Sequence, residues 1–471
     1  MASPVNVPDE PLTPAGRLFL RPEANTIVHC VLGVKHHMDI DTIKTTIKNS
    51  LMCRNPRFCS LLVHDKNGLE HWRRTEIDID KHVILVDTPM ASPAAGDDDV
   101  EKIVNDYLAE LSISSPLSTD KPLWEVHVMM EQKCAIFRLH HALGDGITVM
   151  SMLLGMCKKA EDPEAAPTLV AGGRKNWRRE KGKNWREVLV GFFKTVWFSF
   201  VFCSQLVLRC LWACDRKTVI SGGEGVEFWP RKVATAKFYI EDMKIVKEAI
   251  ANATINDVLF GMISAGLSRY LNYRSPNSLE NGQQITGVAM VNLRETSALQ
   301  NLIETMRKNL GSRRGNKLGV FLLPTYYQTN IDPLQYVKRA KALIDLKKQT
   351  LEAYFSSKVA DLAISLLGPK AASMLNYRIH CNTTFVISNV VGPKEELTIA
   401  GNPITFLRCI TSSLPQALAM HMVSYAGRAD MQIGVAKDII PDPEFLAKCF
   451  EDSLLEMKEA ALATKCVSRK N

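Results

Sequence analysis

The sequence has 471 residues, of which 46% are hydrophobic and 23% are charged. This balance is typical of a globular protein and excludes a disordered chain, a collagen-like fibre and a small disulfide-stapled domain, while about 150 residues per domain predicts two or three domains. The 58 basic and 50 acidic residues give a net charge of +8, and most of this excess falls in one segment described below.

The N-terminal end and the cysteines bear on the cellular compartment. Residues 1–16 are rich in proline and acidic residues and lack the apolar run of a secretory signal. The 12 cysteines are scattered without any CxxC pair, which gives no zinc-type ligand spacing. We therefore expect no metal site, mostly buried free thiols and a catalytic part that faces the reducing cytosol.

The first part of the chain reads as alternating strands and helices. An aliphatic run predicts a strand over Thr26–Val34, and Asp39 or Asp41 is suited to cap the helix that follows. A helix over 98–111 and strands over 124–130 and 134–139 come next, and His140 stands at the end of the last of these strands. A further helix is predicted over 147–156.

Residues 158–187 interrupt this pattern with prolines, glycines and a basic run. Between Arg174 and Glu187 lie seven basic and two acidic residues, together with Trp177 and Trp185. A solvated linker is the simplest interpretation of such a run. Tryptophans among basic residues favour the surface of an anionic membrane instead, because indole rings settle at the level of the lipid headgroups.

Residues 188–214 are strongly apolar, and their longest stretch without a formal charge, Thr195–Leu208, has 14 residues. A membrane span needs about 20 residues, so this length favours a helix that lies in the membrane interface. A narrow polar stripe of Glu187, Lys194, Gln205 and Arg209 on one helical face agrees with that interpretation. A full span and an ordinary core helix remain as alternatives.

Mixed α/β patterning returns after residue 218. The expected elements are strands over 232–240, 284–292, 318–323, 383–388 and 431–435, and a helix over 254–272. The sequence therefore divides into an N-terminal half (1–157), a basic linker with an apolar membrane-interface segment (158–218) and a C-terminal half (219–471).

The segment His140–Gly146, HHALGDG, is the clearest chemical motif. A histidine at a strand end is held rigidly, and its neutral ring accepts a proton near neutral pH because its ordinary pKa is about 6.5. Asp145 lies beyond a turn that the flanking glycines favour, where a carboxylate is suited to hold the loop by pairing with a basic residue. The motif contains no serine or cysteine nucleophile, which favours direct transfer with a general base.

A second HHxxxD match lies at His36–Asp41, where Thr42 replaces the glycine. Because a helix cap is needed there, we interpret Asp39 and Asp41 as capping residues and this match as a decoy.

HHALGDG resembles the active-site motif of CoA-dependent acyltransferases, and its surroundings resemble the plant wax ester synthase/diacylglycerol acyltransferase family. Matching segments occur in the family's order along almost the whole chain: Pro11–Pro14 (PLTP), Pro122–Trp124 (PLW), Asn256–Val258 (NDV), Val291–Arg294 and Ser388–Pro393 (SNVVGP). This order and spacing is more specific than the heptapeptide alone.

The resemblance implies an α/β fold of two CoA-dependent acyltransferase-like domains, each a mixed sheet with flanking helices, with an active-site tunnel between them. It implies that His141 is the proton acceptor, with His140, structural Asp145 and Gly146 beside it. Asn256, Ser388 and Asn389 are the implied substrate contacts. Arg294 or Arg428 is a candidate partner for Asp145. A helix cap is an equally expected role for Asn256 and Asp257, as an alternative to substrate contact. A turn that ends a strand is likewise equally expected for Ser388–Gly392.

The implied substrates are a fatty acyl-CoA and either a long-chain alcohol, giving a wax ester, or a diacylglycerol, giving triacylglycerol, with no resident cofactor. The expected location is the cytosolic face of the endoplasmic reticulum membrane, with the plasma membrane as an additional one. Because a span through 188–214 would separate the two halves, the shared tunnel favours an interfacial segment.

Other functions fit less well. A plant acyltransferase of the HxxxD type would need a DFGWG segment that is absent, and a condensation domain would normally sit in a larger chain. A non-catalytic membrane-bound lipid carrier would keep the tunnel without needing His141. The basic run lacks the aromatic motifs of RNA-binding proteins, so we expect no nucleic-acid partner.

Overall fold

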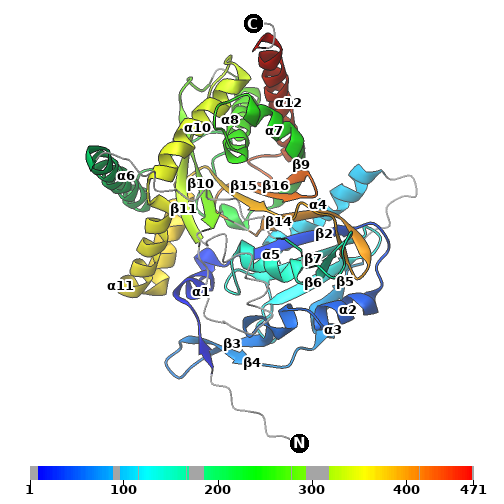
Figure 1. Ribbon diagram of the computed structural model, residues 1–471. Helices are drawn as coiled ribbons and strands as arrows, with labels where there is room; N and C mark the ends of the chain where they lie inside the picture. Colours follow the sequence, from blue (N-terminus) through cyan, green and yellow to red (C-terminus); the bar gives the residue numbers. More distant parts are fainter. Residues whose placement is uncertain are drawn as a thin grey trace, which may run out of the picture.

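Two mixed β-sheets, each covered by helices, make up the two halves of the molecule (Figure 1). The structure is a computed structural model, and it describes residues 9–87, 96–114, 116–165, 167–168, 185–276, 278–292, 318–412 and 414–468. Most of the basic run predicted at 174–187, together with Arg294, lies outside the described residues. The two-domain α/β class expected from the sequence is confirmed.

The N-terminal half is built on a seven-stranded sheet. Its strand order is β5 (Val83–Leu85), β6 (Trp124–Met129), β7 (Cys134–His140), β2 (Ile27–Val34), β14 (Asn402–Thr411), β13 (Leu397–Ile399) and β8 (Cys157–Lys159). A small separate sheet holds β1 (Glu10–Pro11), β4 (Glu70–Arg74) and β3 (Ser60–His64). Strands β13 and β14 come from the C-terminal part of the sequence, so the two halves interlock.

The C-terminal half is built on a six-stranded sheet. Its order is β11 (Leu318–Tyr326), β10 (Gln284–Asn292), β12 (Phe385–Val391), β15 (Leu418–Tyr425), β16 (Arg428–Ala436) and β9 (Arg231–Tyr239). Strands β10, β12 and β15 run parallel to one another, and the other pairs are antiparallel.

Helices cover both sheets and extend from them. The N-terminal half carries α1 (Pro14–Phe19), the short turn η1 (Pro22–Ala24), α2 (Ile40–Lys48), α3 (Ile79–His82), α4 (Asp97–Ser114) and α5 (Gly146–Leu154). The C-terminal half carries α7 (Ile240–Glu248), α8 (Ile255–Arg274), α10 (Pro333–Gln349), α11 (Glu352–Cys381) and α12 (Pro443–Ser468), and α6 (Trp185–Leu211) projects from its side (Figure 1).

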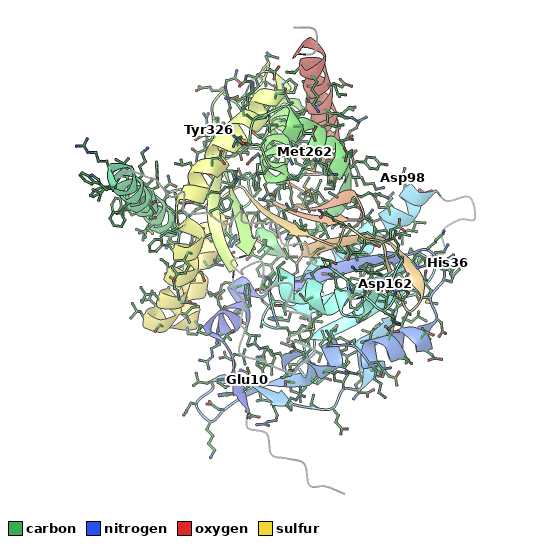
Figure 2. The ribbon with its side chains drawn as sticks, viewed as in Figure 1. Glu10, His36, Asp98, Asp162, Met262 and Tyr326 are labelled. Atoms are coloured by element: carbon green, nitrogen blue, oxygen red, sulfur yellow. The ribbon has the colours of Figure 1, made fainter. Side chains whose placement is uncertain are left out.

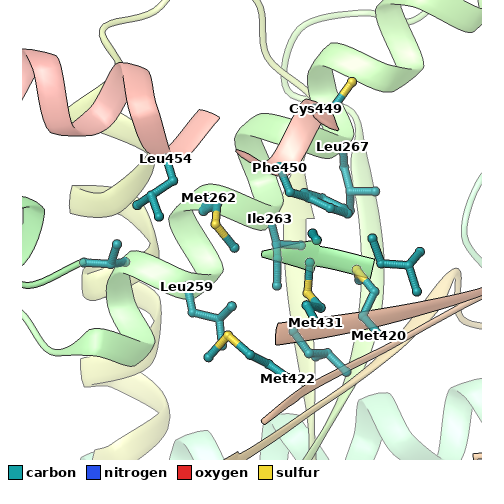
Figure 3. Close-up of a cluster of buried hydrophobic side chains, with 14 of the residues drawn as sticks. Leu259, Met262, Ile263, Leu267, Met420, Met422, Met431, Cys449, Phe450 and Leu454 are labelled. Atoms are coloured by element: carbon teal, nitrogen blue, oxygen red, sulfur yellow. The ribbon is translucent and has the colours of Figure 1, made fainter. Parts of the chain in front are cut away.

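The core of the C-terminal half lies between its sheet and helices α8 and α12. Met420, Met422 and Met431 of the sheet lie close to Met262 of α8, and Phe450 of α12 packs beside them (Figure 3). All five side chains are at most 1% exposed. Methionine is unbranched and adapts to irregular gaps, so it suits a place where two helices cross a twisted sheet.

Local signals explain the elements that the sequence predicted. Asp39 caps α2, and its carboxylate accepts a hydrogen bond from the Thr42 backbone nitrogen (2.8 Å). Thr254 and Asp257 form a reciprocal capping box at the start of α8. His36 of the decoy motif lies exposed at the edge of the molecule, as Figure 2 shows, and its backbone nitrogen donates to Asn402 Oδ1 (3.0 Å).

Candidate active site

The HHALGDG segment connects strand β7 to helix α5. His140 is the last residue of β7 and lies opposite Ile27 of β2. The backbone nitrogen of His141 donates to the Thr26 carbonyl oxygen (3.0 Å), so the pairing with β2 continues one residue past the strand. Both histidines are therefore held on a rigid sheet, as the sequence predicted.

His140 has both ring nitrogens engaged in hydrogen bonds. Its Nε2 lies 2.7 Å from Asn25 Oδ1, and its Nδ1 accepts from the backbone nitrogen of Ala142 (3.1 Å). Burial lowers its pKa to about 4, so the ring is neutral at neutral pH. These bonds fix the ring and the turn after it, which is a structural role.

His141 is buried beneath the aromatic ring of Phe19. The two rings stack with centroids 4.1 Å apart and an angle of 17° between their planes, and the histidine is 7% exposed. Burial lowers the pKa of His141, and the nearby Asp145 carboxylate opposes this only in part. The imidazole is consequently neutral at neutral pH, the state that a general base requires.

Asp145 is fully buried and caps helix α5. Its Oδ1 accepts hydrogen bonds from the backbone nitrogen of Thr148 (2.9 Å) and from Thr148 Oγ1 (2.8 Å). Arg428, suggested above as its partner, is 48% exposed and lies beside Asp430 instead (4.0 Å). The suggestion of Arg428 is wrong, because the carboxylate serves the amino end of a helix rather than this exposed guanidinium.

The glycines of the motif matter because they carry no side chain where neighbouring residues pack closely, and not because of unusual backbone angles. The predicted turn is present at residues 141–143, and neither Gly144 nor Gly146 has a positive φ. A Cβ at Gly144 would lie 2.6 Å from Thr148 Cγ2, so a side chain there would disturb the cap of α5. A Cβ at Gly146 would lie 3.8 Å from Val390 Cγ2, which shows how closely β12 approaches the motif.

The three predicted substrate contacts lie near one another in the C-terminal half. Asn389 Nδ2 donates to Asn256 Oδ1 (2.9 Å), joining the end of β12 to the start of α8. Ser388 precedes Asn389 on β12, and Val390, which follows it, packs against the core of the N-terminal half. The capping role belongs to Asp257, which leaves the Asn256 side chain for the contact with Asn389.

Two further described residues belong to the surroundings of His141. Phe19 is the last residue of α1, the helix that begins at the end of the PLTP segment. This helix lies close to the motif, because a Cβ at Gly16 would lie 3.6 Å from the Ala142 carbonyl oxygen. His421 of β15 lies opposite Ser388 in the strand register, and its Nε2 is 3.2 Å from Thr411 Oγ1. Burial, with a smaller effect of His141, lowers the pKa of His421 to about 4.

Sequence reasoning missed both residues. Phe19 follows a segment that was recognised only as an N-terminal opening, and His421 is the single histidine in a mostly apolar strand, Leu418–Tyr425. Neither signal indicates contact with a motif so distant in the sequence. Within the described residues, no cluster of histidine, cysteine, aspartate or glutamate is suited to hold a metal ion.

Comparisons with known proteins give matches over nearly the whole chain. The family model of the wax ester synthase/diacylglycerol acyltransferase catalytic domain matches residues 35–222, and that of the WS/DGAT C-terminal domain matches residues 314–458. Wax ester synthase/diacylglycerol acyltransferase 11 of Arabidopsis thaliana is 34% identical, over 97% of this chain and 96% of its own. Wax ester synthase/diacylglycerol acyltransferase 2 of the same plant is also 34% identical, over 96% of each.

Solved structures show the same fold at lower identity. The wax ester synthase/diacylglycerol acyltransferase from Marinobacter aquaeolei VT8 has a TM-score of 0.60 at 17% identity, covering 96% of this chain and 99% of that one. The first condensation domain of the calcium-dependent antibiotic synthetase has a TM-score of 0.57 at 12% identity, with 97% of both chains covered.

Proposed function

Because the chain belongs to the wax ester synthase/diacylglycerol acyltransferase family, whose activity is acyl transfer, we propose that it forms esters by direct transfer at His141. The acyl donor is a fatty acyl-CoA. The acceptor is the hydroxyl group of a long-chain alcohol or of a diacylglycerol.

In the proposed step, His141 takes the proton of the acceptor hydroxyl while its oxygen attacks the thioester carbonyl carbon. The tetrahedral intermediate then collapses, the carbon–sulfur bond breaks, and the proton passes to the sulfur of the leaving CoA. No acyl-enzyme forms, and the reaction balances without a resident cofactor. His140 and Asp145 hold the loop that carries the base.

The observation that carries this proposal is the environment of His141. Its ring is neutral because it is buried under Phe19, and its backbone is fixed by pairing with β2. A base that is already unprotonated at neutral pH, on a rigid element, requires little reorganisation before it accepts a proton. Asn256, Ser388 and Asn389 are proposed as substrate contacts, and the tunnel expected between the halves stays a prediction.

The proposal places the enzyme at a membrane, on the cytosolic face of the endoplasmic reticulum. Helix α6 supports this, since Leu189–Leu211 is long and apolar enough to cross a bilayer, judged by length and composition alone. Phe192, Phe193 and Trp197 on this helix are each more than 60% exposed. Long-chain alcohols and diacylglycerols partition into the same lipid phase.

The test is ester formation by membranes that contain the protein, with labelled palmitoyl-CoA and either hexadecanol or diacylglycerol. We expect wild type to form a wax ester or triacylglycerol, and His141→Ala to reduce the rate about 10²–10⁴-fold. His37→Ala, in the exposed decoy motif, is the matched control and should retain wild-type activity.

Equal product from wild type and His141→Ala would refute the assignment of the base. No product from either, with folded protein present, would favour a non-catalytic lipid carrier. Product with only one acceptor would assign the enzyme to wax ester or to triacylglycerol synthesis.

A further inference from the structure

The first part of helix α11 turns its apolar face toward the outside of the protein. Six large side chains along it are between 36% and 72% exposed: Leu351 at its N-cap, Tyr354, Phe355, Val359, Leu362 and Leu366. Their spacing of three to four residues places them on one side of the helix. A helix of an ordinary soluble protein turns such a face inward.

The opposite, polar side of α11 is bonded to the body of the protein. Glu352 is buried and pairs with Lys347 Nζ (2.7 Å), and Ser356 Oγ accepts from the Val320 backbone nitrogen (2.9 Å). These contacts fix the rotation of the helix about its axis. The outward apolar face is therefore built into the fold.

A kink ends this face. Gly368 has φ 82° and is followed by Pro369 inside the helix, so the ladder of helical hydrogen bonds is interrupted there. Beyond the kink, Ala372, Ser373 and Tyr377 are buried against the protein. The segment 351–367 thus forms a separate structural unit with its own exposed surface.

Helix α6 packs against α11 on the same side of the molecule, away from α12 (Figure 1). It adds Phe192, Phe193, Trp197 and Phe200, each at least 61% exposed. We propose that these residues and the outward face of α11, together the α6–α11 surface, dock the enzyme onto a lipid bilayer with both helices lying in the interface.

Helix α6 is too firmly attached to cross the membrane in this arrangement. Phe202 and Leu206 are at most 9% exposed, and Arg209 binds Asp215 (2.9 Å) in the protein body. Of the predicted polar stripe, Arg209 therefore faces the protein, whereas Gln205 is exposed. The part before Phe202, Trp185–Val201, has about 17 residues and spans about 25 Å, less than the roughly 30 Å of a hydrocarbon core. This geometry favours insertion parallel to the membrane.

Charge complements the apolar surface. In the sequence, basic residues from Arg174 to Arg186 immediately precede the apolar part of α6. Lys194 of α6 is exposed, and Lys358 and Asp361 are exposed on α11. Lysine and arginine beside an inserted helix are attracted by anionic headgroups. A bilayer therefore fits this surface better than a protein partner with an apolar groove.

Helix α11 is connected to the proposed base, His141, through helix α1. Helix α11 packs against α1 and η1, and α1 carries Phe19, which stacks on His141. An acceptor dissolved in the membrane would thus approach the site from the side on which the enzyme rests. Only this last consequence depends on the proposed function, because docking itself needs no catalysis.

The test is flotation of the full-length protein with vesicles of phosphatidylcholine, with and without phosphatidylserine. The double variant Leu362→Gln/Leu366→Gln should bind about tenfold more weakly, because both side chains lose their apolar contact with lipid. The matched control is Leu455→Gln/Leu462→Gln on α12, where two leucines are 51% and 43% exposed on the far side of the molecule. It should bind like wild type, and phosphatidylserine should strengthen binding of all three proteins.

Equal vesicle binding by the two double variants would overturn the proposal. So would an α11 variant that loses self-association but keeps vesicle binding, because its apolar face would then be an interface between two copies of the chain. Resistance of the bound protein to extraction at alkaline pH would contradict the interfacial position of α6. His141→Ala should float like wild type, so a failure of catalysis and a failure of docking are told apart.

Discussion

At the residue scale, the protonation state of His141 depends on what covers it. An exposed histidine has an ordinary pKa of about 6.5 and is partly charged in the cytosol. Phe19 removes water from one face of the ring, and the surrounding sheet removes it from the rest. The stacked ring of Phe19 fixes the plane of the imidazole, and for the base proposed above Phe19 would act as a positioning residue.

We predict that Phe19→Ala lowers kcat by about tenfold, because the ring gains freedom to rotate. The exposed imidazole should also recover a pKa nearer its ordinary value. Since the base must be unprotonated, the acidic limb of the pH–rate profile should then move to higher pH. The measurement is kcat between pH 5 and 8 for wild type, Phe19→Ala and Phe19→Trp, with Trp expected to restore both properties. An unchanged limb in Phe19→Ala would reduce Phe19 to a packing residue.

At the scale of elements, Phe450 is one of the buried side chains that attach helix α12 to the C-terminal half. The ring is fully buried against α8, where a Cβ at Gly266 would lie only 2.3 Å from Phe450 Cδ1. The glycine lets the two helices approach closely, and the phenylalanine ring occupies the space that a side chain at Gly266 would need. Neither residue contacts the catalytic motif in the structure, so the pair tests the fold separately from the chemistry.

We expect Phe450→Ala to lower the free energy of unfolding by about 3–5 kcal/mol, because it removes a large buried ring and leaves a cavity. Denaturant unfolding of the purified protein in detergent measures this. Leu455→Gln, one turn further along α12 and 51% exposed, should change it by less than about 0.5 kcal/mol. A comparable loss in both variants would indicate that α12 is stabilised by its surface rather than by this contact.

At the scale of the whole molecule, strand β14 and its Arg408 hold the halves together. The Arg408 guanidinium binds Glu101 of α4 (2.7 Å) and Asp430 of β16 (2.8 Å), and the Arg408 side chain is 5% exposed. Asn105 and Thr235 make a second contact between α4 and β9 (3.3 Å). The interlocked strand and these polar contacts explain why the halves are expected to unfold together.

Stability of the whole molecule should fall as the pH drops from about 6.5 to about 4. Five buried histidines have pKa values that burial lowers to about 3 or 4: His29, His82, His140, His380 and His421. The unfolded chain binds these protons first, so each histidine costs up to about 1.4 kcal/mol per pH unit in that range. Glu352 and Glu451, whose pKa burial raises, act in the opposite direction but are fewer.

Urea unfolding at pH 7.0 and 5.5 measures this dependence. The free energy of unfolding should be clearly lower at pH 5.5, and the difference should shrink in His380→Gln, which removes one titrating ring. His36→Gln, at an exposed position, is the control and should leave the difference unchanged. A stability that does not vary between these two pH values would contradict the buried neutral state of the five rings.

Many strands of the two sheets can be predicted from local patterns of apolar residues in the sequence. β10 over Gln284–Asn292 agrees with its predicted bounds, and β7 includes His140 at its end. The helices α11 and α12 and the strands β14 and β15 were not predicted. The apolar residues of α11 have helical spacing, but this spacing alone does not determine whether the apolar face is buried or exposed.

The sequence by itself determined the family, the two-domain class and the identity of the histidine motif, because these depend on residue types at short, fixed spacings. Only the tertiary structure decided that Phe19 covers His141, that β14 joins the other half's sheet, and that α11 faces outward. Contacts between residues hundreds of positions apart depend on how whole elements pack, and no short pattern encodes that packing.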